Sequence, residues 1–470
     1  MTARRLGRVA LLLIFLSWLC GNVATPVGAA HAQSSGPQYI VQNGDTLYDI
    51  AASFGLSVAE LQAANPSVNA AALTVGKALT IPGFDGVSGT LNTHGLEAGE
   101  TLDSLALRLG LKRDTLVRLN GVVNPEQLYI NEPAVVVDTI DAAPAVPTST
   151  TYIMPDGEGL LEFAAAHHQN PWGLAGVNRL SHPGLVMPGS LVAVPGGDFA
   201  TRALPYPLTQ VLLGPLPAVR GHSLSIQVDT AEPMTVTGVI SDSVLHFLSN
   251  AGSPNEQFAL QGLYRLADPN LYPFTLSATD GSGQAVTLSQ RLPVHAGNFL
   301  VDPPLTVDPA TIDPKVTVPE DAKIFALAAP VTPVRFWDGP FQLPSVGATI
   351  SMFGSLRSYN GGPYDSFHGG VDFSGGEDRP ITAPAPGVVV FTGTLTVRGN
   401  STVIDHGWGV YTGYWHQSRI LVKVGDHVTT GQILGYQGST GRVTGPHLHW
   451  ELIIGDIQVD PLQWTKQAFP

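Results

Sequence analysis

The segment GPHLHWEL, residues 445–452, decides how the C-terminal part of the chain folds. Its residues alternate in type, so that in a strand His447, His449 and Glu451 share one face. The other face carries only apolar side chains, those of Leu448, Trp450, Leu452 and Ile454. Because an apolar face is stabilised by burial, we expect it to pack on a core. The two imidazoles then point together into a cleft or into solvent.

Two more histidine motifs precede this pair, and six of the fourteen histidines lie between positions 368 and 449. The motif HGGVD joins His368 to Asp372 through two glycines, which let the backbone approach other groups closely. His416 ends the run GVYTGYW, residues 409–415. The chain has one cysteine, Cys20, so a metal would be held by His, Asp or Glu.

His368, Asp372 and one histidine of the pair offer an N, O, N donor set. This set suits zinc with a fourth position open for water, whose pKa the metal lowers to about 7. The chain contains no H-E-x-x-H motif, so the base is not the usual helix glutamate. The two remaining histidines are left for acid–base work.

This region resembles the lysostaphin-type (LytM-type) zinc endopeptidases. Their signatures H-x-x-x-D, aromatic-x-H and H-x-H read HGGVD, YWH and HLH here, in a Gly- and Thr-rich frame, and the resemblance covers residues 346–464. It implies a compact, mainly antiparallel β domain that cleaves the peptide part of peptidoglycan, often at glycine-containing or cross-bridge bonds. By the same resemblance the Zn²⁺ ligands are His368, Asp372 and His449. The catalytic histidines, which orient water and stabilise the oxyanion, are His416 and His447.

Other polar residues nearby receive plainer interpretations. His406 and His427 fall in predicted turns and are left out of the site. Glu451 shares the face of the histidine pair but looks further from the metal, which favours a supporting or salt-bridge role. The candidates for lining the substrate groove, in the loop before His368, are Arg357, Tyr359 and Asn360.

Three repeats occupy the N-terminal part of the chain. GDTL, GETL and GEGL begin at Gly44, Gly99 and Gly157, spaced by 55 and 58 residues, and 21 residues after each glycine stands an asparagine: Asn65, Asn120 and Asn178. The first unit predicts a strand at 39–41, a helix capped by Thr46 or Asp45, a second helix from about 57, and a strand at 78–81.

This βααβ order resembles the LysM module, which implies binding to glycans that contain N-acetylglucosamine, such as peptidoglycan. The predicted copies are 38–83, 93–138 and 150–196. The second and third are degenerate, because the strand before Gly99 is weak and Pro171 and Trp172 stand where a helix should begin. In the alternative interpretation the repeated Gly and Asn residues serve only turns.

The middle of the chain changes to period-two alternation. Residues 205–298 predict an all-β immunoglobulin-like sandwich that acts as a spacer. GHSLS, residues 221–225, hints at a nucleophile elbow, but Ser225 replaces the final glycine and we interpret it as a strand edge. Residues 299–345 are rich in proline and predict a semi-extended linker with one short helix around 320–328.

The N-terminus reads as an export signal, residues 1–32. Three arginines precede a 13-residue apolar run at 9–21, and Ala30-His31-Ala32 supplies a small-x-small cleavage site. The location is then secreted or cell envelope, with an uncleaved anchor as the alternative. Lipidation at Cys20 is rejected because Trp18 and Leu19 are bulky. No other apolar stretch is long enough to span a bilayer, so no stable membrane span is expected after cleavage.

Composition agrees with a multi-domain, folded, exported protein. The chain has 470 residues, of which 44% are hydrophobic and 13% charged, and 52 glycines and 38 prolines favour strands and turns. A net charge of −14 argues against nucleic acid as a partner. The sequence therefore predicts a zinc metalloendopeptidase that hydrolyses peptidoglycan and is tethered to glycan by LysM repeats. The alternatives are a non-catalytic envelope protein that binds peptidoglycan and activates other wall hydrolases, and an enzyme for Gly-rich proteins.

Overall fold

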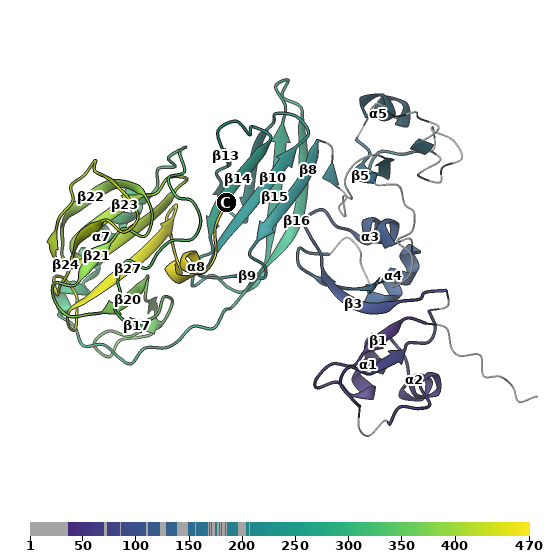
Figure 1. Cartoon of the computed structure of the whole chain (residues 1–470), viewed down its shortest axis with the longest axis horizontal. Helices are drawn as coiled ribbons and strands as arrows, with labels where there is room; N and C mark the ends of the chain where they lie inside the picture. The colour runs from purple at the N-terminus through teal and green to yellow at the C-terminus, as the bar shows by residue number, and fades with distance from the viewer. Residues whose placement is uncertain are drawn as a thin grey trace, which may run out of the picture. The chain divides into compact units, whose positions relative to one another are not determined.

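The computed structural model describes residues 36–69, 73–84, 86–109, 111–122, 128–138, 149–155, 157–167, 169, 171, 174–175, 178, 180, 184, 186–195, 204–205 and 207–470. The predicted signal segment and Trp172 lie outside these residues. The chain divides into two compact units, Met1–Leu91 with Val137–Ile140, and Asn92–Val136 with Asp141–Pro470. Figure 1 shows a mostly β protein with few helices.

The first repeat has the predicted βααβ order. Its elements are β1 (Gln38–Ile40), α1 (Leu47–Ser53), α2 (Val58–Ala64) and β2 (Ala78–Thr80), with β1 and β2 antiparallel. Of the two capping candidates, Thr46 accepts from the Asp49 backbone N–H, while a reciprocal capping box opens the second helix. The helices bury the apolar residues Leu47, Ile50, Ala51 and Leu61.

The repeated asparagines make the same hydrogen bonds in all three copies. Asn65 Nδ2 donates to the carbonyls of Leu61 and Thr80 at 2.9 and 2.8 Å, and its Oδ1 accepts from Thr80 N at 2.8 Å. The equivalent pairs are Leu116 with Val135 around Asn120, and Leu174 with Ala193 around Asn178. Each asparagine therefore ties a helical carbonyl four residues back to the closing strand, which is a structural role.

The second and third copies keep most of the same elements. The second has β3 (Thr90–Gly95), α3 (Leu102–Leu109), α4 (Arg113–Asn120) and β4 (Pro133–Asp138), so the strand that looked weak before Gly99 is formed. The third has β5 (Ser149–Ile153), α5 (Leu160–Ala166) and β6 (Leu191–Pro195); β5 pairs with β6 and with β7 (Leu204–Pro205). The second copy bonds to the following β region, since Ile130 N donates to Arg291 O at 2.9 Å.

The region from 208 to 295 forms two sheets. One has the order β13-β14-β10-β8 and the other β12-β11-β15-β16-β9. The strands are β8 (Leu208–Gly214), β9 (Ala218–Val219), β10 (Ser223–Thr230), β11 (Thr235–Ile240), β12 (Ser243–Leu245), β13 (Leu248–Ser249), β14 (Glu256–Gly262), β15 (Asn270–Thr279) and β16 (Ala285–His295). Both sheets contribute to one hydrophobic cluster, with Ile226 from β10 and Leu276 from β15. Ser223 is buried at the start of β10 and accepts from Trp464 Nε1 at 2.8 Å. GHSLS therefore leads into a strand, but β10 lies between β14 and β8 and is not an edge strand.

The proline-rich segment is more ordered than a semi-extended linker. It contains a 3₁₀ turn, Pro309–Thr311, and α7 (Pro314–Ala328), which begins six residues before the expected position 320. Asp313 caps the helix and Pro314 stands at its first turn, where a missing N–H costs nothing. Ile324 and Ala328 are fully buried in a cluster with residues of the C-terminal sheet. The prediction from the proline count was wrong here, because it did not take account of the apolar residues that bury one face of this helix.

The C-terminal domain is built on a ten-stranded sheet with the main order β17-β20-β27-β24-β23-β22-β25. Figure 1 shows β27 between β20 and β24. The strands are β17 (Thr349–Ser351), β20 (Val371–Ser374), β21 (Pro380–Thr382), β22 (Gly387–Leu395), β23 (Gly399–Asp405), β24 (Val410–Ile420), β25 (His427–Val428), β26 (Ile433–Gln437), β27 (His447–Ile454) and β28 (Ile457–Val459). A hairpin, β18 (Leu356–Arg357) with β19 (Ser366–Phe367), and a final helix, α8 (Pro461–Lys466), complete it.

The alternation of β27 is confirmed. Leu448, Trp450 and Leu452 are fully buried in the core. The opposite face is also covered, since His449 and Glu451 are 8% and 4% exposed. The histidine face therefore opens into a cleft rather than onto a free surface. In the part of the chain that the structure describes, no helix is long and apolar enough to cross a membrane.

We predict that Asn65→Ala destabilises the first repeat. The change leaves the N–H and C=O of the half-buried Thr80 without their partner. A fully buried unsatisfied group costs about 1–3 kcal/mol, and a half-buried one costs less. Amide hydrogen exchange at Thr80 should accelerate accordingly. The exposed Asn43, changed to Ala, serves as the control. Equal protection of Thr80 in both variants would contradict the structural role of Asn65.

Candidate active site

Three neighbouring strands position the predicted residues. β27 pairs antiparallel with β20, which sets Asp372 directly opposite His449, and with β24, which sets Trp415 opposite His449. His368 precedes β20 by two glycines, and the chain bends at Gly370 so that the His368 ring lies beside Asp372 and His449. A Cβ at Gly370 would lie 2.2 Å from the carbonyl oxygen of Trp450, so this close approach requires glycine.

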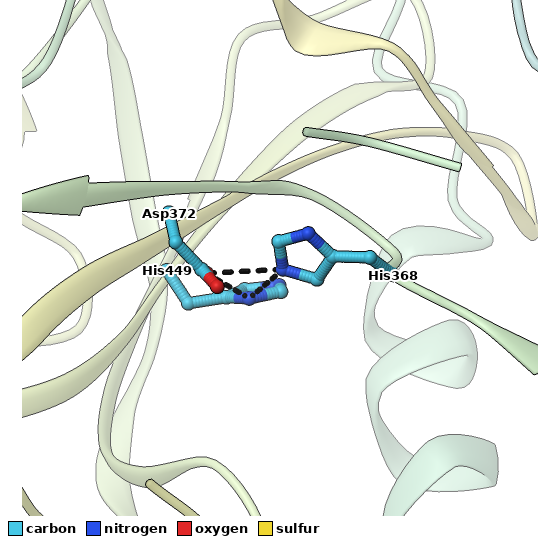
Figure 2. A group of neighbouring side chains, drawn as sticks. All are labelled: His368, Asp372 and His449. Atoms are coloured by element: carbon cyan, nitrogen blue, oxygen red, sulfur yellow. Dashed lines mark hydrogen bonds and ion pairs between the residues drawn. The ribbon is translucent and has the colours of Figure 1, made fainter. Parts of the chain in front are cut away.

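His368, Asp372 and His449 direct one atom each to a common point. His368 Nε2 lies 3.0 Å from Asp372 Oδ1 and 2.8 Å from His449 Nδ1, and the last two atoms are 2.8 Å apart. Figure 2 shows the three side chains pointing toward one another. Among the described residues, this is the one group of at least three His, Cys, Asp or Glu side chains with metal-binding spacing.

The outward nitrogens of both histidines are occupied. His368 Nδ1 donates to the Met352 carbonyl at 3.0 Å, and His449 Nε2 donates to Glu451 Oε1 at 3.0 Å. Because a carbonyl can only accept, the neutral His368 ring keeps its lone pair on Nε2. His449 lies between two carboxylates, and with its proton on Nε2 toward Glu451 it has its lone pair on Nδ1. Two imidazole nitrogens and one carboxylate oxygen, oriented in this way, are a donor set that fits zinc. The supporting role expected for Glu451 therefore has a geometric basis.

His416 and His447 lie beside this group. His416 sits at a bulge in β24 with φ of 63°, which re-aims its ring, and its Nδ1 donates to Thr440 O at 2.8 Å. His447 Nδ1 donates to Gly445 O at 2.8 Å. The two ring centroids are 4.9 Å apart, and His447 Nε2 is 3.7 Å from Asp372 Oδ1. Both neutral rings thus carry their lone pair on Nε2.

The site combines ionised carboxylates with uncharged histidine rings. Burial would raise the pKa of Asp372, but the adjacent His368 and His449 outweigh it and hold that pKa well below its usual range. Burial lowers the pKa of His368 to about 4, against the pull of Asp372. Burial, with the neighbouring histidines, also lowers the pKa values of His416 and His447. At neutral pH these three imidazoles are therefore uncharged and able to bind a cation or a proton.

The site opens into a cleft of about 800 Å³, and two of the three predicted lining residues line it. Arg357 contacts the site directly, because its Nη2 lies 3.2 Å from Asp372 Oδ2. Tyr359 lies under the guanidinium of Arg442, whose Cζ is 4.6 Å from the ring centroid. Asn360 instead holds Val307 through two backbone hydrogen bonds and does not line the cleft.

Two histidines excluded on sequence grounds lie away from the cleft. His406 is fully buried, with its ring nitrogens bonded to Pro386 O and Thr412 Oγ1, and His427 is exposed on β25. Ser351, whose Oγ lies 3.0 Å from His368 Nδ1, was not predicted. No motif marks this residue, because it reaches the site through the pairing of β17 with β20.

Two parts of the chain match known protein families. Residues 366–461 match the profile of peptidase family M23 and form a peptidase domain of that family. Residues 39–82 and 97–132 match the LysM domain. The third repeat falls outside this match, although it forms the same asparagine bonds as the other two.

Individual relatives match over the peptidase domain. The peptidoglycan DD-endopeptidase ShyA of Vibrio cholerae is 49% identical over 96 residues, which is 20% of this chain and 22% of ShyA. Lysostaphin of Staphylococcus simulans is 35% identical over 123 residues, or 24% of this chain and 25% of lysostaphin. The chain thus spans about a quarter or less of the length of these relatives. A crystal structure of a putative peptidase M23 from Pseudomonas aeruginosa is 25% identical, with a TM-score of 0.41, over 54% of this chain and 97% of that one.

We predict that the chain binds about one zinc ion and that Asp372→Ala and His449→Ala lose it, because each removes one of three converging donors. Metal analysis after dialysis against a weak chelator measures this. His427→Ala removes an exposed histidine outside the cleft and should keep the metal. Full zinc retention in Asp372→Ala and His449→Ala would overturn the assignment.

Proposed function

We propose that the protein is an exported zinc metalloendopeptidase that hydrolyses stem peptides or peptide cross-links of peptidoglycan. The observation that carries this proposal is the convergence of His368, Asp372 and His449 beside two neutral imidazoles in an open cleft. The M23 match over 366–461 supports it. Since the match to ShyA is 49% identical and the match to lysostaphin 35%, we propose a DD-type cross-link as the substrate bond.

His368 Nε2, Asp372 Oδ1 and His449 Nδ1 would hold the zinc. When bound, zinc acts as a Lewis acid and lowers the pKa of water. His416 and His447, each with Nδ1 held by a backbone carbonyl, present Nε2 toward the reacting groups. One of them accepts the proton of the attacking water, and the same pair, once protonated, stabilises the oxyanion and supplies a proton to the leaving amine. Their lowered pKa values keep them in the proton-accepting form at neutral pH.

The remaining parts would bring this site to an insoluble substrate. We propose that the LysM copies at 38–83, 93–138 and 150–196 bind glycan strands. Because their asparagines are engaged in holding the fold together, glycan contact falls to other residues of the repeats. The region 205–298 is proposed to be an immunoglobulin-like sandwich that acts as a spacer, and residues 1–32 an export signal. Tethering raises the local concentration of the enzyme without any new contact in the active site.

We predict that His416→Ala and His447→Ala keep zinc but lose most hydrolysis, because a positioned acid–base group contributes roughly 100- to 10,000-fold. The assay is digestion of purified peptidoglycan with mass analysis of the released fragments, run beside metal analysis of the same samples. Loss of metal in either variant would mean that the roles in the HLH pair are reversed or shared. Absence of cleavage by the zinc-loaded wild-type chain would favour the non-catalytic alternative, a peptidoglycan-binding activator of other hydrolases.

We predict that deleting residues 33–83, the first repeat, weakens binding to insoluble peptidoglycan and leaves cleavage of a small soluble peptide unchanged. The deletion lies within a unit separate from that of the peptidase domain. Pelleting is compared in the His447→Ala background, so that the substrate is not digested during the assay. Unchanged pelleting would reduce this repeat to a spacer, and a collapse of soluble-peptide cleavage would mean that it supports catalysis directly.

A further inference from the structure

The segment 299–328, upstream of the matched peptidase domain, forms part of the wall of the active-site cleft. Asp302 N donates to Leu356 O and Leu305 N donates to Ser358 O, both at 2.9 Å, so the segment runs alongside residues 356–359 through two isolated parallel bridges. Some residues of this segment line the cleft, the first being Asp302 and the last Phe325. Two carboxylates of this segment, those of Asp302 and Glu320, are connected to the site through different intermediate residues.

The first route reaches the metal side through one arginine. Asp302 Oδ2 lies 3.2 Å from Arg357 Nε, and Arg357 Nη2 lies 3.2 Å from Asp372 Oδ2. The other oxygen of Asp372 is the one that faces His368 and His449. Arg357 thus fixes the rotation of the Asp372 carboxylate, and Asp302 fixes Arg357. Asp302 also gives Arg357 a second carboxylate partner beside the metal site.

The second route reaches His416 through a backbone turn. Glu320 on α7 is 7% exposed, and its two oxygens accept from Val397 N at 2.9 Å and Arg398 N at 3.0 Å. The carbonyl of Arg398 in turn accepts from His416 N at 2.9 Å. His416 has a positive φ, which persists only where surrounding bonds hold it. Glu320 therefore holds the turn at Val397 and Arg398, and this turn holds the bulge at His416.

Glu320 has a natural control beside it. Asp321 contacts the same arginine, with Oδ1 2.8 Å from Arg398 Nη2, but its side chain is 49% exposed. Asp321 meets the turn through the guanidinium of Arg398, whereas Glu320 also accepts from two backbone N–H groups of the turn. Substituting Asp321 removes the same charge from the same helix without releasing the turn.

We propose that Asp302 and Glu320 are positioning residues of the peptidase site, Asp302 for Asp372 and Glu320 for His416. The segment 299–328 is then a working part of the catalytic unit rather than a spacer. This inference rests on the proposed function, because it assigns Asp372 to the metal and His416 to catalysis. Substitutions of outer partners of metal sites typically cost 10- to 100-fold in affinity or activity, which sets the scale of the effect.

The test uses the full chain with three single variants, Asp302→Ala, Glu320→Gln and Asp321→Asn. Zinc affinity is measured by competition with a chromogenic chelator, and peptidoglycan cleavage is measured at limiting and at saturating zinc. Asp302→Ala should bind zinc about 10-fold or more weakly, with cleavage recovering at saturating zinc. Glu320→Gln places an amide N–H₂ against one of the two backbone N–H donors, Val397 N and Arg398 N. We therefore expect kcat to fall about 10- to 100-fold. Zinc affinity should stay within about 3-fold of wild type, which also shows that the site is folded.

Asp321→Asn should keep zinc affinity and kcat within about 3-fold of wild type, on the same scale of outer-partner effects, and because Asp321 lines the cleft any change should appear in KM. Equal losses in Asp321→Asn and Glu320→Gln would overturn the turn-holding role, because charge alone would then explain the effect. Unchanged zinc affinity in Asp302→Ala, or faster cleavage in any variant, would overturn the proposal for that residue. If wild type binds zinc but cleaves nothing, the proposed function fails, while the zinc measurement still decides the role of Asp302.

Discussion

The site depends on the antiparallel pairing of β20 with β27, which places Asp372 directly opposite His449. Directly opposed residues of such a pair have side chains about 5 Å apart, so the register alone brings two donors together. A slip of β27 by one residue would turn His449 to the other face while Asp372 stayed in place, and the two donors would no longer meet. The apolar residues Leu448 and Trp450 oppose such a slip, since it would expose them. Core burial therefore holds the donor geometry.

Each site histidine is further constrained by the group on its outer nitrogen. Backbone carbonyls hold His368, His416 and His447, and the carboxylate of Glu451 holds His449. The partner of each ring decides which nitrogen keeps the lone pair. His449 differs from the others because its partner is charged: burial alone would lower its pKa, but Asp372 and Glu451 together raise it. A cation bound at Nδ1 is favoured by the same two carboxylates.

Much of this arrangement was predictable from the sequence because it is local. The alternation in HLHWEL, the four-residue step from His368 to Asp372 and the 21-residue step to each asparagine are short-range patterns with direct structural meaning. The third repeat shows the limit of family matching, since its asparagine bonds persist where the profile no longer matches. Asp302 and Glu320 were missed because their partners lie 55 and 77 residues away, and because eight nearby prolines favoured an extended linker. The bulge that turns His416 likewise depends on a neighbouring strand.

In the proposed function, the three converging donors bind a zinc ion that is needed to cleave peptidoglycan. The most direct test removes the metal from the full chain, returns zinc in steps, and measures bound zinc and released peptidoglycan fragments in the same samples. We expect cleavage to rise in proportion to occupancy and to level off near one zinc per chain. Cleavage by the metal-free chain, or full occupancy without cleavage, would contradict it.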